Sequence, residues 1–270
     1  MIDFDKFIRV ILYFIGMSLV FIPLERSFLS KPYRILRKEY RTDLFFYLGQ
    51  NLFWNSLTLI TLNLLFSGLE SSLLSDLRGK FQLFPFLLQA LSVILMGDFL
   101  IYWGHRWQHK YDWLWRFHRI HHTAERVDYL AAFREHPLDN IYTRGLESLP
   151  AFLLGFGLEE VSMFIAFRGI YALFIHSNVS LRLGVLEIIF GSPHLHHWHH
   201  EVDRGGKCNF ANLNPMMDII FGTFYNPHTP PKRYGVNEDH AGNYPSLLLE
   251  PFLPNDLPKK FRDFMDKFPG

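Results

Sequence analysis

The chain has 270 residues, of which 49% are apolar, 17% aromatic and 20% charged, and its formal net charge is +1. This composition excludes a disordered chain, a collagen and a coiled coil, and the weak net charge argues against a nucleic-acid partner. The single cysteine, Cys208, excludes a disulfide framework, a cysteine-held iron–sulfur cluster and a multi-cysteine zinc site. The 14 histidines leave a histidine-only metal site as the metal chemistry that the composition favours.

Four long apolar blocks dominate the chain up to its middle. A helix needs about 20 mainly apolar residues to cross a bilayer, and the blocks 7–24, 44–69 and 83–103 approach or exceed this length. The first block lacks a basic start and a cleavage site, so we interpret it as a retained helix rather than a signal peptide. Two glycines interrupt the block 146–175 and predict two shorter helices. The fold class expected is therefore an all-α integral membrane bundle of three or four spans, and the alternative is a soluble protein with buried core helices.

Basic residues indicate how such a bundle would be oriented. The loop after the first block carries six of them, whereas the loop between the second and third blocks carries only Arg78 and Lys80. Because Lys and Arg accumulate in cytoplasmic loops, the first loop and the end of the third block, near Trp103, are predicted to face the cytoplasm. The six residues of the first loop are Arg26, Lys31, Arg34, Arg37, Lys38 and Arg41.

We expect three parts along the chain. Residues 1–80 would hold N-terminal transmembrane helices, and residues 81–225 a catalytic part with a cytoplasmic helical cap that carries a dinuclear histidine site. Residues 226–270 are rich in proline, which predicts a solvated tail that wraps over the cytoplasmic face.

The histidines are spaced for metal binding. Residues three or four apart share one face of a helix, so their imidazoles can reach one ion. Three sets show this spacing, and His176 ends the fourth apolar block nearby. Since one metal takes about four ligands, eight or nine histidines indicate two metals. The absence of paired Glu-x-x-His motifs argues against a soluble carboxylate-bridged di-iron bundle. The three sets are His105 and His109; His118, His121 and His122; and His196, His199 and His200.

With these motifs the stretch 98–225 resembles the fatty acid hydroxylase and sterol desaturase superfamily of membrane di-iron oxygenases. Its first box, D-x-x-x-Y-x-x-H-R-x-x-H, begins at Asp98, and its second box is found in the run WRFHRIHHT. The A-F-R-x-H-P turn begins at Ala132, and the H-S-N segment at His176. The last box, P-x-x-H-x-x-H-H, begins at Pro193, and the closing stretch is carried by Asn209, Phe210, Asp218, Phe221, Gly222 and Thr223.

Two features depart from that family pattern. Relatives usually have glycine where Ala211 stands, which leaves the local turn open. His194 and His197 are additional histidines in the last box, and either one is a candidate to support a ligand or to replace one.

The resemblance implies metal ligands and supporting residues. Asp98 would accept the second ring N–H of a ligating histidine, or alternatively pair with an arginine. Asp218, like Asp128, would orient an imidazole, or alternatively serve as a cap or in a salt bridge. Asn178 would hold a metal-bound water or cap a helix. The implied ligands are His105, His109, His118, His121, His122, His136, His176, His196, His199 and His200.

The implied activity is hydroxylation or desaturation of a lipid C–H bond by two iron ions, with zinc as a possible occupant after purification. O₂ and two external electrons would be required, and the chain has no haem or iron–sulfur motif of its own. A cytochrome b5-like or ferredoxin-like donor is therefore the implied partner, beside the lipid substrate and the bilayer.

Two alternatives stay open. A membrane zinc hydrolase would need a general-base glutamate, and Glu201 follows the last box but outside the H-E-x-x-H arrangement. A non-enzymatic histidine-rich metal transporter or store would spread its ligands along the spans.

Overall fold

A computed structural model describes residues 4–31, 36–67 and 72–254, and these residues form helices and loops without a strand. Two isolated bridges, Leu29 with Val179 and Glu201 with Tyr234, are the β-type pairs of the described residues. The all-α prediction is therefore confirmed for this part of the chain. The longer helices are α1 (Phe4–Ser27), α2 (Tyr40–Gly49), α3 (Asn55–Ser67), α4 (Ser72–Phe81), α5 (Phe86–Lys110), α6 (Asp112–His122), α7 (Pro137–Leu153) and α8 (Leu158–His176).

Short helices complete the fold beyond α8. They are α9 (Pro193–His199), α10 (Met216–Ile220) and α11 (Tyr244–Leu249), together with the 3₁₀ turns η2 (Ala131–Phe133), η3 (Gly184–Ile188) and η4 (Glu250–Phe252). The π-helical turn η1 (Gln50–Trp54) joins α2 to α3.

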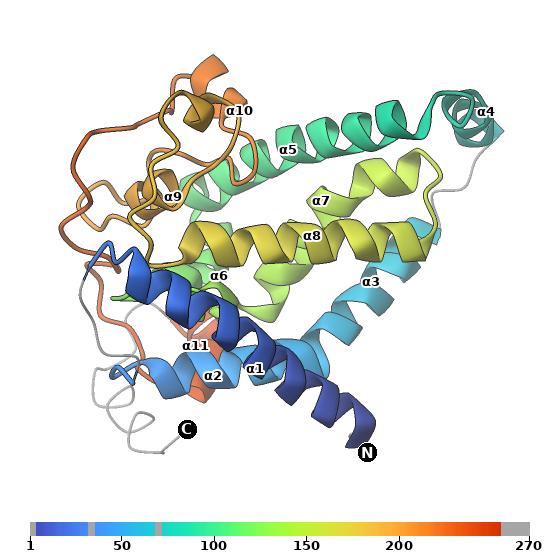
Figure 1. The fold of residues 1–270 in the computed structure, drawn as a ribbon. Coiled ribbons are helices and arrows are strands. Elements are labelled where there is room, and N and C mark those ends of the chain that lie inside the picture. Colours follow the sequence, from blue (N-terminus) through green and yellow to red (C-terminus); the bar gives the residue numbers. More distant parts are fainter. Residues whose placement is uncertain (1–3, 32–35, 68–71, 255–270) are drawn as a thin grey trace.

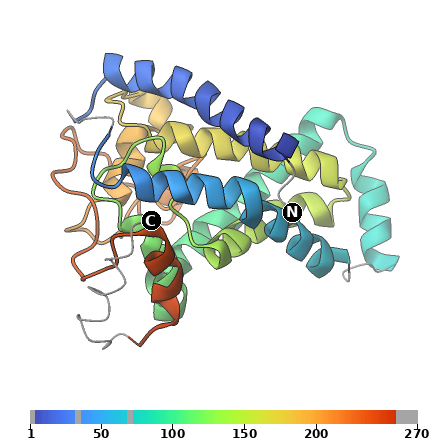
Figure 2. The same cartoon turned by 90° about the horizontal axis from the view of Figure 1, so that it is seen from below.

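Helices α1, α5 and α8 run in roughly the same direction, and the histidine-rich elements gather where these helices end. Figure 1 shows α5 and α8 running from the α4 end of the molecule towards α9, α10 and the loops around them. Helix α1 also ends on that side, and seen from below it runs beside α2 (Figure 2). The C-terminal ends of α5 and α8, which carry His105, His109 and His176, therefore reach the same region as α6 and α9.

The sequence explains where several helices begin and end. Helix α5 starts directly after Pro85, and α7 and α9 each start with a proline, which is pre-set for the first helical position. Ser192 caps α9 by accepting a hydrogen bond from the amide of Leu195 (3.3 Å). Between α7 and α8 the chain turns at Gly155, whose φ is +88°. The predicted break of the fourth apolar block into two helices is confirmed.

Within the described ranges, two helices are long and apolar enough to cross a membrane. They are α1 and α5, in which only 11% and 28% of the most apolar window is buried within the protein. Their outward side chains are large and apolar, as at Leu19 and Leu87, which are 71% and 68% exposed. The second predicted block is helical from Tyr40 to Ser67, but η1 divides it into shorter α-helices. The number of spans stays a prediction.

One basic residue after α1 is less exposed than its charge suggested, whereas Arg26, Lys38 and Arg41 are exposed. Arg37 is buried against Asp43 and Asp128, so it is an internal ion-pair partner rather than a free surface charge. Arg34 lies outside the described residues.

The described part of the tail, 226–254, is only partly solvated: residues 228–230 and 237–239 are exposed, whereas the stretch around α11 packs against the bundle. Leu247 and Ala241 form a buried cluster with Phe46 of α2 and Ile120 of α6. Thr42 donates a hydrogen bond to the carbonyl of Gly242 (2.9 Å). The three consecutive leucines of α11 supply the apolar surface that the proline-rich composition concealed.

The closest approach of α5 to α7 yields a stability prediction. A Cβ atom on Gly104 would overlap Leu146 and approach the hydroxyl of Tyr142 to 3.3 Å. Gly104→Val should therefore lower the free energy of unfolding by about 1–3 kcal/mol, the usual cost of overpacking. Gly169→Val on α8 is the matched control, because a Cβ there meets no atom within 4 Å. Thermal unfolding of both purified variants checks this, and equal midpoints would contradict the close approach.

Candidate metal centre

Nine histidines converge in two adjacent groups. Within each group the candidate ligand atoms lie within 4.8 Å of one another. The i, i+4 pair of α6, His118 and His122, belongs to the first group, whereas His121 on the neighbouring face belongs to the second. The groups are His105, His109, His118, His122 and His199, and His121, His176, His196 and His200.

Backbone carbonyls fix the orientation of four of these rings. Because a carbonyl oxygen only accepts, the Nδ1 atom that faces it must carry the proton. The Nε2 atom of each neutral ring is then an unprotonated lone pair, which is the form that binds metals. The four contacts are His105 Nδ1 to Phe210 O (2.7 Å), His199 Nδ1 to Cys208 O (2.8 Å), His121 Nδ1 to Arg134 O (3.1 Å) and His176 Nδ1 to Ala172 O (2.7 Å).

The Nε2 atoms point at one another. His121 and His176, both fixed in this tautomer, bring their Nε2 atoms to 3.0 Å. In the first group the Nε2 atoms of His105 and His118 are 3.1 Å apart. Two facing lone pairs repel each other unless a cation lies between them. Burial lowers the pKa of His118 to about 3 and that of His199 well below its usual range, so protons are poor candidates for that cation.

The donor set fits metal ions. Neutral imidazole suits iron, zinc and copper. The Nε2 atom of His109 is buried and has no hydrogen-bond partner among the described residues, as expected of an atom reserved for a metal. Gly206, at φ +63°, lies so close that a Cβ there would overlap the His109 ring. Each group therefore has the composition and the geometry to hold one ion.

Asp139 supports the first group and was missed by the sequence analysis. The Nδ1 atom of His118 lies 3.0 Å from its Oδ2 atom, and Gln108 donates to its Oδ1 atom (2.6 Å). A carboxylate on the outer nitrogen of a ligating histidine fixes its orientation and raises its basicity. Asp139 follows the quoted A-F-R-x-H-P turn by two residues, but only the packing of α7 on α5 and α6 shows that it faces His118.

Asp98, predicted to hold a histidine, pairs with an arginine instead. Its Oδ1 atom accepts from Arg168 (2.6 Å), while His105 is held by the carbonyl of Phe210. The arginine alternative for Asp98 is therefore the one found, because α8 places Arg168 beside this face of α5.

His136 and Asn178 lie outside both histidine groups. His136 caps α7 by accepting from the amide of Leu138 (3.1 Å), and its Nε2 atom donates to the carbonyl of Leu248 (3.1 Å), so both ring nitrogens are occupied. Asn178 joins the chain near Lys31, where its side chain pairs with both the amide (3.1 Å) and the carbonyl (2.7 Å) of that residue. The ligand role of His136 and the water-holding role of Asn178 thus have no support in this geometry.

Asp218 acts on the site through the backbone. It accepts hydrogen bonds from the amides of Phe210 (2.8 Å) and Ala211 (2.9 Å). The carbonyl of the same Phe210 accepts from His105, so Asp218 positions the acceptor of a candidate ligand. The left-handed residue in this turn is Asn209, with φ +53°, which explains why alanine is tolerated at 211.

The two additional histidines of the last box lie outside the groups. His194 donates to the carbonyl of Pro227 (2.7 Å). His197 faces the carbonyl of His176 (3.4 Å) and the hydroxyl of Tyr234 (3.1 Å). They fasten the loop 226–234 to α9.

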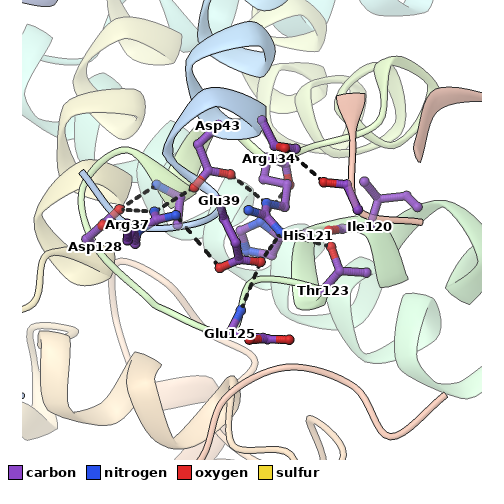
Figure 3. A network of polar contacts seen from close by, with 12 residues as sticks. Arg37, Glu39, Asp43, Ile120, His121, Thr123, Glu125, Asp128 and Arg134 are labelled. Carbon is purple, nitrogen blue, oxygen red and sulfur yellow. Dashed lines mark hydrogen bonds and ion pairs between the residues drawn. The ribbon is translucent and has the colours of Figure 1, made fainter. Parts of the chain in front are cut away.

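A buried ion-pair cluster holds the acceptor of His121 (Figure 3). Arg134, whose carbonyl accepts from His121, donates through its guanidinium to Asp43 (2.6 Å) and Glu39 (3.0 Å). Arg37 pairs with the same Asp43 and with Asp128 (2.8 Å), the aspartate that was predicted to orient an imidazole. The start of α2 is thereby tied to the loop that follows α6.

One cavity borders both groups. Its volume is about 90 Å³. Its wall includes two histidines of the first group and three of the second, with further residues from α5, α7 and α8. The five histidines are His105, His118, His121, His176 and His196.

Metal content tests the two-group arrangement. Protein purified without oxygen should hold two metal ions per chain by elemental mass spectrometry. His199→Ala and His200→Ala remove one ligand from different groups, so each should lose the ion of one group. The control is His228→Ala, because His228 is exposed and lies outside both groups. Full metal content in both ligand variants would contradict the assignment.

Asp139→Asn tests the support of His118. We expect metal affinity to fall about 10–100-fold, as for other carboxylates behind ligating histidines. Asp203→Asn changes a carboxylate that is 62% exposed, and it should leave affinity unchanged. Chelator competition gives the affinities, and equal values for the two variants would refute the role of Asp139.

Comparison with known proteins agrees with this site. The family model described as fatty acid hydroxylase matches residues 90–223. Ornithine lipid hydroxylase OlsE of Rhizobium tropici is 32% identical over 170 residues, which cover 62% of this chain and 51% of that protein. Human alkylglycerol monooxygenase is 34% identical over 49% of this chain and 30% of its own length. Methylsterol monooxygenase 1-3 of Arabidopsis thaliana is 29% identical over 50% and 47%.

The chain thus spans about half the length of these relatives, or less. No solved structure matches. The matched region contains every histidine of both groups, and the chain belongs to the fatty acid hydroxylase and sterol desaturase superfamily.

Proposed function

We propose that the chain is a membrane enzyme that hydroxylates a C–H bond of a lipid at two iron ions. The observation that carries this proposal is the pair of all-histidine groups that border a single cavity. The three relatives named above are a hydroxylase and two monooxygenases with lipid or sterol names, which favours oxygen insertion over desaturation.

The histidines would hold the irons, five in the first group and four in the second. Iron bound in this way supplies the reduction of O₂ that oxidation of an unactivated C–H bond requires. The balance is one O₂, two electrons and two protons for each C–H bond converted to C–OH, with one water released. The chain itself positions the substrate carbon in the cavity and excludes bulk water. We propose an external cytochrome b5-like or ferredoxin-like protein as the source of electrons.

The arrangement in the membrane is also part of the proposal. Helices α1 and α5 would span the bilayer, with the α2–α3 run and the α7–α8 hairpin as further crossings. The histidine end would lie at the cytoplasmic face, on the side of the basic loop after α1. Residues 1–80 then anchor the enzyme, 81–225 carry the chemistry, and the tail from 226 covers the cytoplasmic end.

The zinc-hydrolase alternative needs a carboxylate base at the metal. Glu201 accepts from the amide of Arg204 (2.8 Å) and does not line the cavity, whereas Glu135 and Glu147 do. The geometry therefore does not favour Glu201 as such a base. An activity assay of the zinc-loaded protein separates the hydrolase from the oxygenase, because a hydrolase would be fully active with zinc alone.

Turnover of the iron-loaded enzyme tests the proposed function. Incubated with ¹⁸O₂, a chemical reductant and a bacterial lipid extract, it should form a lipid that carries one ¹⁸O atom, detected by mass spectrometry. His121→Ala should abolish this product while the protein stays in the membrane fraction, and His228→Ala should retain it. An unlabelled lipid pool, or full turnover in His121→Ala, would count against the proposal.

A further inference from the structure

The cavity beside the histidines is lined by charged groups, which an acyl-chain tunnel would not need. Glu135, Arg144, Glu147 and Arg168 all contribute to its wall. Ionisable groups at membrane depth are expensive, so they mark a functional pathway by default. The aliphatic side chains of the wall come from different elements, namely Ile101, Ala132, Leu146, Ala172 and Leu213.

Several hydrogen-bond donors of this wall are engaged within the protein. Arg168 donates to Asp98 (2.6 Å) and to the carbonyl of Ile94 (3.1 Å). Arg144 donates to Glu147 (2.6 Å). The tyrosine hydroxyls of the wall are also hydrogen-bonded within the protein, since Tyr142 donates to Gly104 O (3.3 Å) and Tyr171 to Gly191 O (2.7 Å).

Acceptors remain available on the same wall. The Oε1 atom of Glu147 is buried and receives no hydrogen bond among the described residues, although Arg168 Nε lies 3.4 Å away. Glu135 receives one bond, from Asn140 (2.8 Å). With Asp98 behind Arg168, three carboxylates face two guanidinium groups, which leaves one net negative charge. The wall is thus complementary to a ligand that carries N–H donors and a positive charge.

The size of the cavity limits what it can hold. Its volume of about 90 Å³ is room for several waters. A short polar fragment fits this space.

We propose that this cavity binds the polar headgroup of the lipid substrate and that Glu135 and Glu147 hold a primary ammonium group of that headgroup. The inference rests on the proposed function, because it places the oxidised carbon in or next to the headgroup. Metal ions in the histidine groups would repel an ammonium group, so the carboxylates would keep it on their own part of the wall. The acyl chains would then stay in the bilayer, beside the exposed apolar faces of the helices.

Lipid binding to zinc-loaded protein tests this proposal without turnover. Three lipids with identical acyl chains are compared by native mass spectrometry in detergent: phosphatidylethanolamine with a primary ammonium, phosphatidylcholine with a trimethylammonium, and phosphatidylglycerol with no amine. A preference of at least fivefold for phosphatidylethanolamine over both others is the expected result. Any smaller preference would overturn the proposal, and this comparison needs no variant.

Variants then assign the preference to the cavity. Glu147→Gln and Glu135→Gln keep the size of the side chain but remove its charge, and each should bring the preference below fivefold. Glu238→Gln alters an exposed carboxylate outside the cavity and should retain it. Normal metal content shows that a variant has kept its fold. A preference retained in both cavity variants would place the ammonium site elsewhere and overturn the assignment.

The two proposals fail in different ways. Selective binding of the amine lipid without any ¹⁸O product would reject the proposed function and leave the headgroup site standing. A lipid labelled with ¹⁸O in its acyl chain, together with unselective binding, would reject the headgroup site and leave the oxygenase standing.

Discussion

The geometry of the site follows from one constraint, the convergence of unprotonated ring nitrogens in a buried space. Four imidazoles donate a hydrogen bond from Nδ1–H to a backbone carbonyl, so their Nε2 lone pairs are directed inward. At 3.0 Å between His121 and His176, these lone pairs need a cation to be stable. Burial makes protonation of rings such as His118 unfavourable, and metal ions are the cations that neutral imidazoles bind best. Metal binding and folding of this region are therefore expected to be coupled.

Two of the carbonyls that fix the rings belong to residues that are held by charged side chains outside both histidine groups. Asp218 binds the amide of Phe210 and so positions the carbonyl that His105 uses. Arg134 presents its carbonyl to His121 while its guanidinium is clamped by Asp43 and Glu39 of the α2 region (Figure 3). Breaking a buried ion pair from one side costs about 3–5 kcal/mol. The α2 region thus contributes to the orientation of His121 in the candidate metal site.

The sequence allowed prediction of those features that depend on local spacing. The i, i+3 and i+4 patterns identified His118, His121 and His122, because the faces of a helix are fixed by its period. The spacing does not show that His121 belongs to a different group from its neighbours, since that depends on where α8 and α9 lie. Asp139 was missed and Asp98 misassigned for the same reason: the partner of each comes from another helix. Prolines in the tail suggested solvation, but tertiary packing of Leu247 outweighed that composition.

Charged side chains in the cavity wall are unexpected in an apolar bundle. We explain their presence by a role in orienting the substrate. Asp98, Glu147 and Arg168 form a linked ion-pair chain between α5, α7 and α8. Such a chain stabilises a fold weakly or not at all once desolvation is included. A gain in stability therefore does not explain why this ion-pair chain is present. Binding of a polar headgroup near the histidines would explain it. Headgroup anchoring and ring orientation would then serve the same purpose, because both limit which carbon can approach the two histidine groups.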